Sequence, residues 1–211
     1  ILEGMTQELQ RQYVSQGRYG ALVETEVKQL PRNRVAVNIN IDEGDVAKIR
    51  HINMVGNSEF TEEELLESFE QQTTGWLSWI TSDDKYAREK LSGDLETLES
   101  WYLDRGYLQF KVASTQVSIS PEKESVYITI NVDEGDVYTI GEVDLAGELM
   151  IPELQVRAMI ILKEGMTFSQ TLMTTSSEYI TRRLGNEGYT FAEVEGFPEV
   201  NEEDKTAKIT Y

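Results

Sequence analysis

The chain has 211 residues, with 38 acidic against 19 basic side chains and a formal net charge of −19. A surface this anionic repels phosphate groups, so we expect neither nucleic acid nor an anionic lipid surface as a partner. No apolar run approaches the roughly 18 to 20 residues that cross a bilayer. The absence of cysteine excludes disulfides and thiol chemistry.

In chain order, the opening residues carry apolar side chains at helical spacing, which predicts a helix that ends near Gly17. Two strand-like runs follow at 21–30 and 35–41, joined by a turn. The acidic string DEGDV comes next, at 42–46, and occurs again at 133–137, 91 residues later. Self-similarity at a fixed period predicts a repeated structural unit.

The segments that follow the two copies of DEGDV match as well. Each begins with a strand-like run that ends in glycine, Gly56 in the first copy and Gly147 in the second. Each then offers two helices. Thr61 with Glu64 predicts a capping box at the start of one helix, and Pro152 suits the first turn of its counterpart.

Two strand-like runs close the middle unit, at 110–120 and 126–132, and a last run begins at about Ala207. The repeated unit is therefore β-α-α-β-β, which is an α+β fold. We expect the C-terminal half of a unit at 1–44, a complete unit at 45–135, and a nearly complete unit, cut in its last strand, at 136–211. The sequence begins at Ile1 with neither an initiator Met nor a signal-peptide pattern, so we expect a fragment of a longer protein.

The string DEGDV admits three interpretations. Between two strands it suits a hairpin turn, and its carboxylates suggest a metal site, although they lack the spacing of an EF-hand loop. The matching order of helices and strands on both sides favours a junction between units instead. We assign to the two junctions the residues Asp42, Glu43, Gly44, Asp45, Asp133, Glu134, Gly135 and Asp136.

Four strings carry a family resemblance: LPRNRV at 30–35, GDLETL at 93–98, YLDRGY at 102–107 and STQVS at 114–118. Together with the β-α-α-β-β order, they resemble the tandem POTRA domains of the Omp85 family, in its gamma-proteobacterial BamA branch. The resemblance implies POTRA domains 2, 3 and 4 for the three segments, each with a three-stranded mixed sheet covered by two antiparallel helices. It also implies a periplasmic scaffold of outer-membrane β-barrel assembly, attached to the membrane through a C-terminal barrel of the full-length protein.

The resemblance further implies that the second strand of each sheet lies at an exposed edge. Such an edge accepts an extended chain as an additional strand. The partners implied are unfolded outer-membrane protein clients, the lipoprotein BamB at the middle unit, and other Bam lipoproteins through the rest of the parent chain. In the middle unit this edge strand contains Val112, Ala113, Thr115, Gln116, Val117, Ser118 and Ile119.

The resemblance implies that Val117 and Ile119 point outward, and they are the side chains that we expect to contact BamB. Alternation along a strand puts both on one face, but it leaves open whether that face points outward or toward the helices of the unit.

Catalysis has little support in the sequence. His51 is the only histidine, so neither a catalytic triad nor a histidine metal cluster is expected. Paired carboxylates fall at predicted helix starts and turns, where they suit the helix dipole. We therefore expect no enzyme activity, cofactor or metal, and we expect Trp76 and Trp79 to fold back over the helices. Two alternatives stay open: a POTRA module of another Omp85-type transporter, and an acidic calcium-binding structural repeat.

Overall fold

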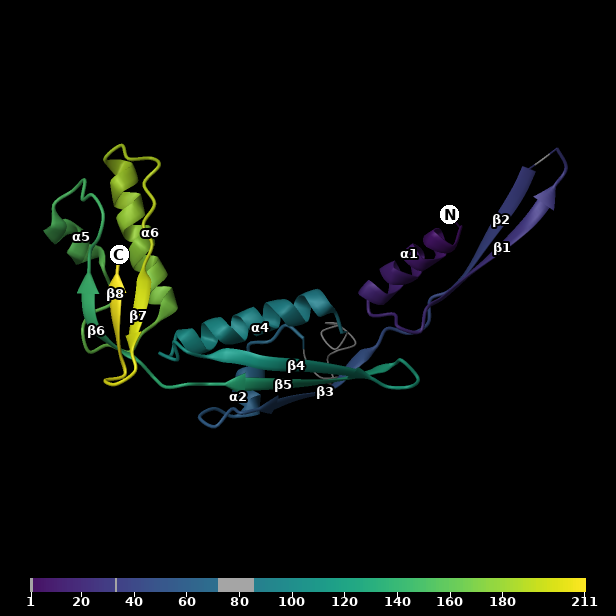
Figure 1. Ribbon diagram of the computed structural model, residues 1–211, viewed down its shortest axis with the longest axis horizontal. Helices are drawn as coiled ribbons and strands as arrows, with labels where there is room; N and C mark the ends of the chain where they lie inside the picture. The colour runs from purple at the N-terminus through teal and green to yellow at the C-terminus, as the bar shows by residue number, and fades with distance from the viewer. Residues whose placement is uncertain (1, 33, 72–85) are drawn as a thin grey trace. The chain divides into compact units, whose positions relative to one another are not determined.

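The computed structural model describes residues 2–32, 34–71 and 86–211 (Figure 1). The chain divides into two compact units, Ile1–Thr97 with Val112–Val132 and Leu98–Lys111 with Asp133–Tyr211. Helices and mixed three-stranded sheets occur together, so the predicted α+β class is confirmed. Trp76 and Trp79 lie outside the described residues.

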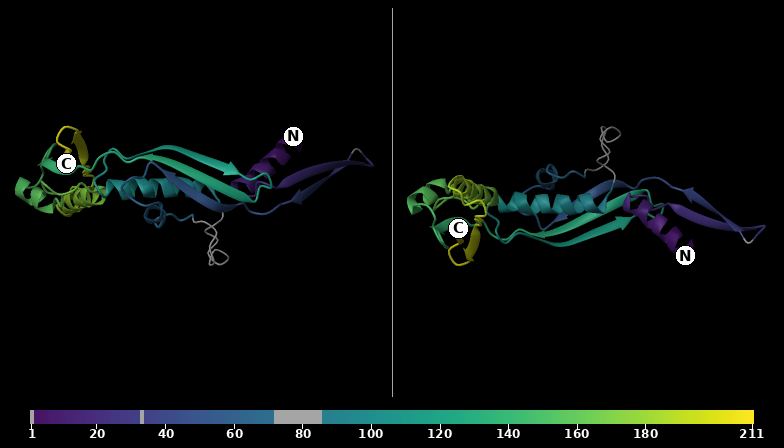
Figure 2. Two further views of the ribbon diagram at one scale, coloured as in Figure 1. Left: turned by 90° about the horizontal axis from the view of Figure 1, so that it is seen from below. Right: turned by 90° about the horizontal axis from the view of Figure 1, so that it is seen from above.

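The first unit opens with helix α1 (Leu2–Ser15) and a long antiparallel hairpin of β1 (Leu22–Leu30) and β2 (Arg34–Asp42) (Figure 2). These bounds agree with the predicted helix and strands. The hairpin is a two-stranded sheet in the part of the chain that the structure describes. Two small apolar residues at its base, Ala21 and Val23, are buried, whereas α1 buries none of its own side chains.

The rest of the first unit is built around a three-stranded sheet. Its strands are β3 (Lys48–Val55), β4 (Lys111–Ile119) and β5 (Ser125–Asp133), in the order β3-β5-β4. The last strand, β5, is central and runs parallel to β3, which makes this a mixed sheet of the kind that the family resemblance implies. Apolar side chains of alternate positions on β5 are buried, so one face of this sheet carries the core.

Two helices accompany this sheet, α2 (Glu62–Leu66) and α4 (Arg88–Leu103). The predicted capping box begins α2, because Thr61 and Glu64 bond reciprocally to each other's backbone N–H groups. The part of helix α4 that ends at Thr97 belongs to this unit. The buried apolar side chains of this part include Ile49, Ile52, Leu65, Leu91, Val126, Ile128 and Ile130.

Gly56 follows β3 with a φ of +95°, which favours glycine. A Cβ at this position would stand 2.1 Å from the carbonyl oxygen of Val132. The residue is therefore required both by its backbone conformation and by the close approach of β5.

The second unit contains β6 (Thr139–Asp144), α5 (Glu153–Met159), α6 (Gln170–Asn186), β7 (Phe197–Asn201) and β8 (Thr206–Thr210). Its sheet has the order β6-β8-β7, with β8 parallel to β6 and antiparallel to β7. The last strand, β8, begins at Thr206, one residue before the predicted start at Ala207. Pro152 precedes α5 in an extended conformation instead of lying in its first turn, because its ψ of 133° is not helical.

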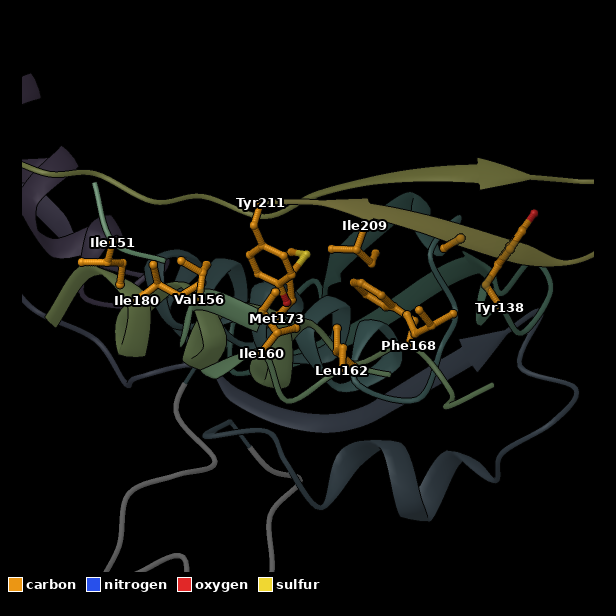
Figure 3. Packing of buried hydrophobic residues seen from close by; sticks show 12 residues of the cluster. Tyr138, Ile151, Val156, Ile160, Leu162, Phe168, Met173, Ile180, Ile209 and Tyr211 are labelled. Carbon is orange, nitrogen blue, oxygen red and sulfur yellow. The ribbon is translucent and has the colours of Figure 1, made fainter. Parts of the chain in front are cut away.

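Figure 3 shows the core of this unit between the strands and the two helices. Its buried side chains include Tyr138, Ile140, Val156, Ile160, Leu162, Phe168, Ile180, Ala207 and Ile209. Among the described residues, no helix is long and apolar enough to cross a membrane.

Candidate functional site

Strand β4 forms one edge of its sheet. It is bonded to β5 on one side and has no strand on the other within the described part of the chain. Its outward N–H and C=O groups are therefore available to an incoming strand. This is the strand that the family resemblance implies as the binding edge.

The hydrogen bonds at the end of the β4–β5 hairpin show which N–H groups point outward. Ser120 donates its N–H to the carbonyl of Ser125 at 2.8 Å, and Asn131 Nδ2 donates to Ser114 Oγ at 2.9 Å in the same pairing. In an antiparallel ladder, bonded positions alternate with unbonded ones. Even-numbered residues of β4 thus direct their N–H groups to β5, and odd-numbered ones, including Val117, direct theirs to the free edge.

The same pairing places the side chains of β4. Val117 lies opposite Ile128 and Ile119 opposite Val126, and residues directly opposite each other share a face. Both β5 side chains are buried, so Val117 and Ile119 lie on the face that carries the core and do not point outward as the resemblance implies. They are nevertheless 38% and 37% exposed, since they lie at the margin of the sheet.

The remaining residues proposed for the edge are also accessible. Val112 and Thr115 are half-buried, whereas Ala113, Gln116 and Ser118 are exposed. The strand therefore combines free backbone groups with a row of partly exposed apolar and small polar side chains.

Charge is confined to the ends of β4. Lys111 Nζ lies 3.0 Å from the Asp133 carboxylate, and 112–120 contains no charged side chain. Charged residues in the middle of an edge strand normally prevent unwanted pairing. The centre of β4 lacks that protection.

The two DEG junctions have the same backbone contacts. Gly17 accepts a hydrogen bond from the N–H of Ala47, and Gly106 accepts one from the N–H of Tyr138, both at 2.9 Å. The junction glycines have positive φ values, +61° at Gly44 and +68° at Gly135, which explains why both copies keep glycine there.

The acidic side chains of the junctions have structural partners. Tyr13 donates its hydroxyl proton to Glu43 at 3.3 Å, and Tyr102 donates to Glu134 at 2.8 Å. The second bond is buried. Burial, together with the hydrogen bond and charge of Glu134, raises the pKa of Tyr102 far above its usual value, so the phenol keeps its proton.

The other junction carboxylates lie at the surface. Asp42 Oδ1 accepts a hydrogen bond from the N–H of Gly44 at 3.2 Å, and Asp136 pairs with Lys205 at 2.6 Å. Asp45 is exposed. Within the described residues, no group of three or more His, Cys, Asp or Glu side chains is placed to hold a metal ion.

Two aspartates with buried or capping roles were missed by the sequence analysis. Asp94 of α4 is 3% exposed and accepts hydrogen bonds from the N–H groups of Glu70, at 2.6 Å, and Gln71, at 3.1 Å. Burial raises the pKa of Asp94, and these hydrogen bonds offset part of the rise. The signal was its position between Leu91 and Leu98 on the apolar face of the helix.

Asp104 follows α4 and accepts hydrogen bonds from donors at the start of α6. It accepts hydrogen bonds from Ser169 Oγ at 3.0 Å and from the N–H and Oγ1 of Thr171, each at 2.7 Å. Burial raises the pKa of Asp104, but these hydrogen bonds and the charge of Arg105 outweigh it and hold the pKa below its usual value. No local sequence pattern connects residues so far apart in the chain.

Comparisons with known proteins identify the family of the chain. A family model described as "POTRA: Surface antigen variable number repeat" matches residues 47–135 and 138–211. The chain is similar to the outer membrane protein assembly factor BamA of Neisseria meningitidis serogroup B, with 29% identity over 199 residues, which cover 94% of this chain and 25% of the relative. BamA of Buchnera aphidicola is 30% identical over 181 residues, which cover 85% of this chain and 29% of the relative.

Solved structures show the same fold. The crystal structure of Haemophilus influenzae BamA POTRA3-5 superposes with a TM-score of 0.60 at 20% identity, covering 100% of this chain and 78% of that one. BamA of Haemophilus ducreyi lacking POTRA domains 1–3 also gives a TM-score of 0.60, at 19% identity over 78% of this chain and 28% of that one. The matched part of the chain spans between 25% and 29% of the length of these two relatives.

Proposed function

Because the chain belongs to the POTRA family, we propose that it is a non-enzymatic scaffold for the assembly of outer-membrane β-barrels, which binds extended protein segments along β4. Its relatives are named as outer membrane protein assembly factors. In this proposal the chain lies in the periplasm and is held at the outer membrane by the remainder of a longer protein.

The observation that supports the proposal is the free, uncharged edge of β4. Pairing along a strand edge uses main-chain hydrogen bonds, which carry little sequence information. A receptor for many different unfolded barrel proteins needs that tolerance. The half-exposed Val117 and Ile119 beside the edge add apolar contact area for alternate side chains of the incoming strand.

The proposal includes lipoprotein partners at the same surface. We assign the edge of β4 as the docking strand for BamB, and the other Bam lipoproteins to the rest of the longer chain. The proposed domain bounds are 1–44, 45–135 and 136–211, corresponding to parts of POTRA domains 2, 3 and 4. In this assignment the DEG junctions are linkers and bind no cofactor.

A proline substitution tests the edge directly. The N–H of Val117 points to the free edge, so Val117→Pro removes a bond to the partner while leaving the bonds to β5 in place. We expect the variant to keep the circular dichroism spectrum of the parent and to lose binding of a fluorescent barrel-strand peptide, measured by anisotropy.

Val117→Thr is the matched control, because it keeps both the N–H and the β-branched shape. It should bind the peptide and BamB as the parent does. If Val117→Pro is folded and still binds both partners with parental affinity, β4 is not the binding edge.

A further inference from the structure

Strand β4 presents two different rows of side chains beside its free edge. The apolar row, on the core face of the sheet, consists of Thr115, Val117 and Ile119, which are all partly exposed. The polar row, on the opposite face, consists of Ser114, Gln116 and Ser118, which are all exposed. An incoming strand along this edge (Figure 1) therefore meets largely apolar surface on one face and hydroxyl and amide groups on the other.

The polar row continues across the sheet as groups that carry no carboxylate, ammonium or guanidinium. Asn131 of β5 donates its side-chain amide to Ser114 at 2.9 Å, and Tyr127 of β5 lies opposite His51 of β3. The outward polar side chains of this part of the sheet are Tyr127, Thr129 and Asn131 on β5 and His51 and Asn53 on β3. Hydroxyl and amide groups of this kind can donate to or accept from an uncharged polar side chain.

The equivalent face of the second unit is different. Lys208 of β8 lies opposite Glu142 of β6 and Glu199 of β7, and Lys208 Nζ is 3.2 Å from the Glu142 carboxylate. The edge strand β7 also places Phe197, which is 58% exposed, on this charged face. The edge of β7 thus lacks the separation into two rows that β4 has.

We propose that β4 selects incoming strands in which apolar and polar residues alternate, and that its two rows make the selection. The inference rests on the proposed function, because it concerns the strand that binds the same edge. Residues directly opposite each other on paired strands share a face. Every second residue of the incoming strand therefore lies beside the apolar row, and the residues between them lie beside the polar row.

The two rows discriminate for different physical reasons. Apolar cross-strand neighbours stabilise a sheet, so an apolar residue beside Val117 or Ile119 gains contact. An apolar residue beside Gln116 or Ser118 covers polar groups without bonding to them, which costs free energy. A shift of the register by one residue exchanges the two sets, so it cannot rescue a strand that does not alternate.

The selected pattern is that of a transmembrane barrel strand, in which lipid-facing apolar residues alternate with polar residues that face the interior. The selection depends on the period of the pattern and not on the identity of each residue. It is therefore compatible with many different client sequences.

Two labelled peptides of the same composition and of the nine-residue length of β4 test the selection on the 211-residue chain. In one peptide valine alternates with threonine and glutamine, and in the other the valines form one block. Measured by fluorescence anisotropy, the alternating peptide should bind about tenfold more tightly, since several cross-strand pairs differ between the two. Val117→Pro supplies the baseline without strand addition.

The double substitution Gln116→Val with Ser118→Val makes the polar row apolar. It should reduce the preference for the alternating peptide to about twofold or less, because the blocked valines then find apolar neighbours on both faces. The matched control Gln116→Ser with Ser118→Thr keeps the row polar and should keep the preference. If the double variant associates with itself, the single Gln116→Val should reduce the preference in the same direction.

Each result distinguishes the selection from strand addition itself. Equal binding of the two peptides to the parent overturns the selection and leaves strand addition at β4 in place. A preference that survives in the valine variants also overturns it, because the polar row is then not its source. If the parent binds neither peptide, strand addition fails and the selection fails with it.

Discussion

One hydrogen bond and its counterpart in the preceding repeat allow the account to be tested within a single chain. Tyr102 donates its hydroxyl proton to Glu134 at 2.8 Å, and both side chains are buried. Tyr13 makes the equivalent bond to Glu43 at 3.3 Å in an exposed position. Replacing each Tyr by Phe removes only a hydroxyl group.

The two substitutions should have different costs. A hydrogen bond to a charged acceptor contributes about 1.5 to 3 kcal/mol, and Tyr102→Phe preserves the stacking on Phe110, whose ring centroid is 4.0 Å away. We expect Tyr102→Phe to lower the free energy of unfolding by about 2 kcal/mol. Tyr13→Phe should lower it by less than about 0.5 kcal/mol, because water replaces the lost partner of an exposed carboxylate.

Urea unfolding followed by far-ultraviolet circular dichroism gives both free energies. Hydrogen exchange over residues 98–111 then locates the effect, because opening around Tyr102 should become easier in the Tyr102→Phe variant alone. Equal losses for the two variants would refute the reasoning, since burial would then have no influence. A loss of less than about 0.5 kcal/mol for Tyr102→Phe would do the same.

Three further substitutions have defined outcomes. Asp94→Ala removes the acceptor of two backbone N–H groups and should cost about 2 kcal/mol of unfolding free energy in urea titrations; an unchanged midpoint would contradict this. The lowered pKa of Asp104 stabilises the fold above the unfolded value of about 3.9, and this stability is lost as the pH falls through the folded value. Asp104→Asn should therefore be less stable than the parent at neutral pH, by about 1 kcal/mol after allowance for the partial exposure of Asp104. The unfolding free energies of the variant and the parent should converge in acid. A difference that stays constant at every pH argues against a role for the charged carboxylate. Gly56→Ala should lower the free energy of unfolding by about 3 kcal/mol, because the added Cβ meets the carbonyl oxygen of Val132. The control Gly147→Ala has a similar φ but no atom within 4 Å of the added Cβ, so it should lower the stability clearly less in thermal unfolding. A larger loss for Gly147→Ala would exclude the steric cause.

Local sequence signals predicted those features that local interactions determine. The capping box at Thr61 and Glu64 appears as expected because both of its bonds join residues three positions apart. The two strand-like runs at 110–120 and 126–132 appear as β4 and β5 for the same reason, whereas the mixed sheet was implied only by the family resemblance. The predicted start of α5 was one residue too early, since proline is compatible both with the first turn of a helix and with the extended residue before it.

Features that depend on distant contacts were not visible in the sequence. Alternation put Val117 and Ile119 on one face but did not say which face, and only the pairing with β5 shows that it is the face carrying the core. Asp94 interrupts an apolar stripe, yet its partners are backbone groups at residues 70 and 71. Nothing in the sequence around Asp104 indicates that its carboxylate accepts a hydrogen bond from Ser169 at the start of α6, 65 residues later.

The central claim is that β4 binds an extended segment as an additional strand. Residue-resolved hydrogen exchange, recorded by NMR with and without a saturating barrel-strand peptide, tests it most directly. We expect an alternating pattern. Exchange of the amides of Ala113, Thr115, Val117 and Ile119 should slow markedly on binding, whereas exchange of the even-numbered amides between them, already bonded to β5, should change little. Protection that is uniform along β4, or that appears elsewhere while β4 stays unchanged, would contradict strand addition at this edge.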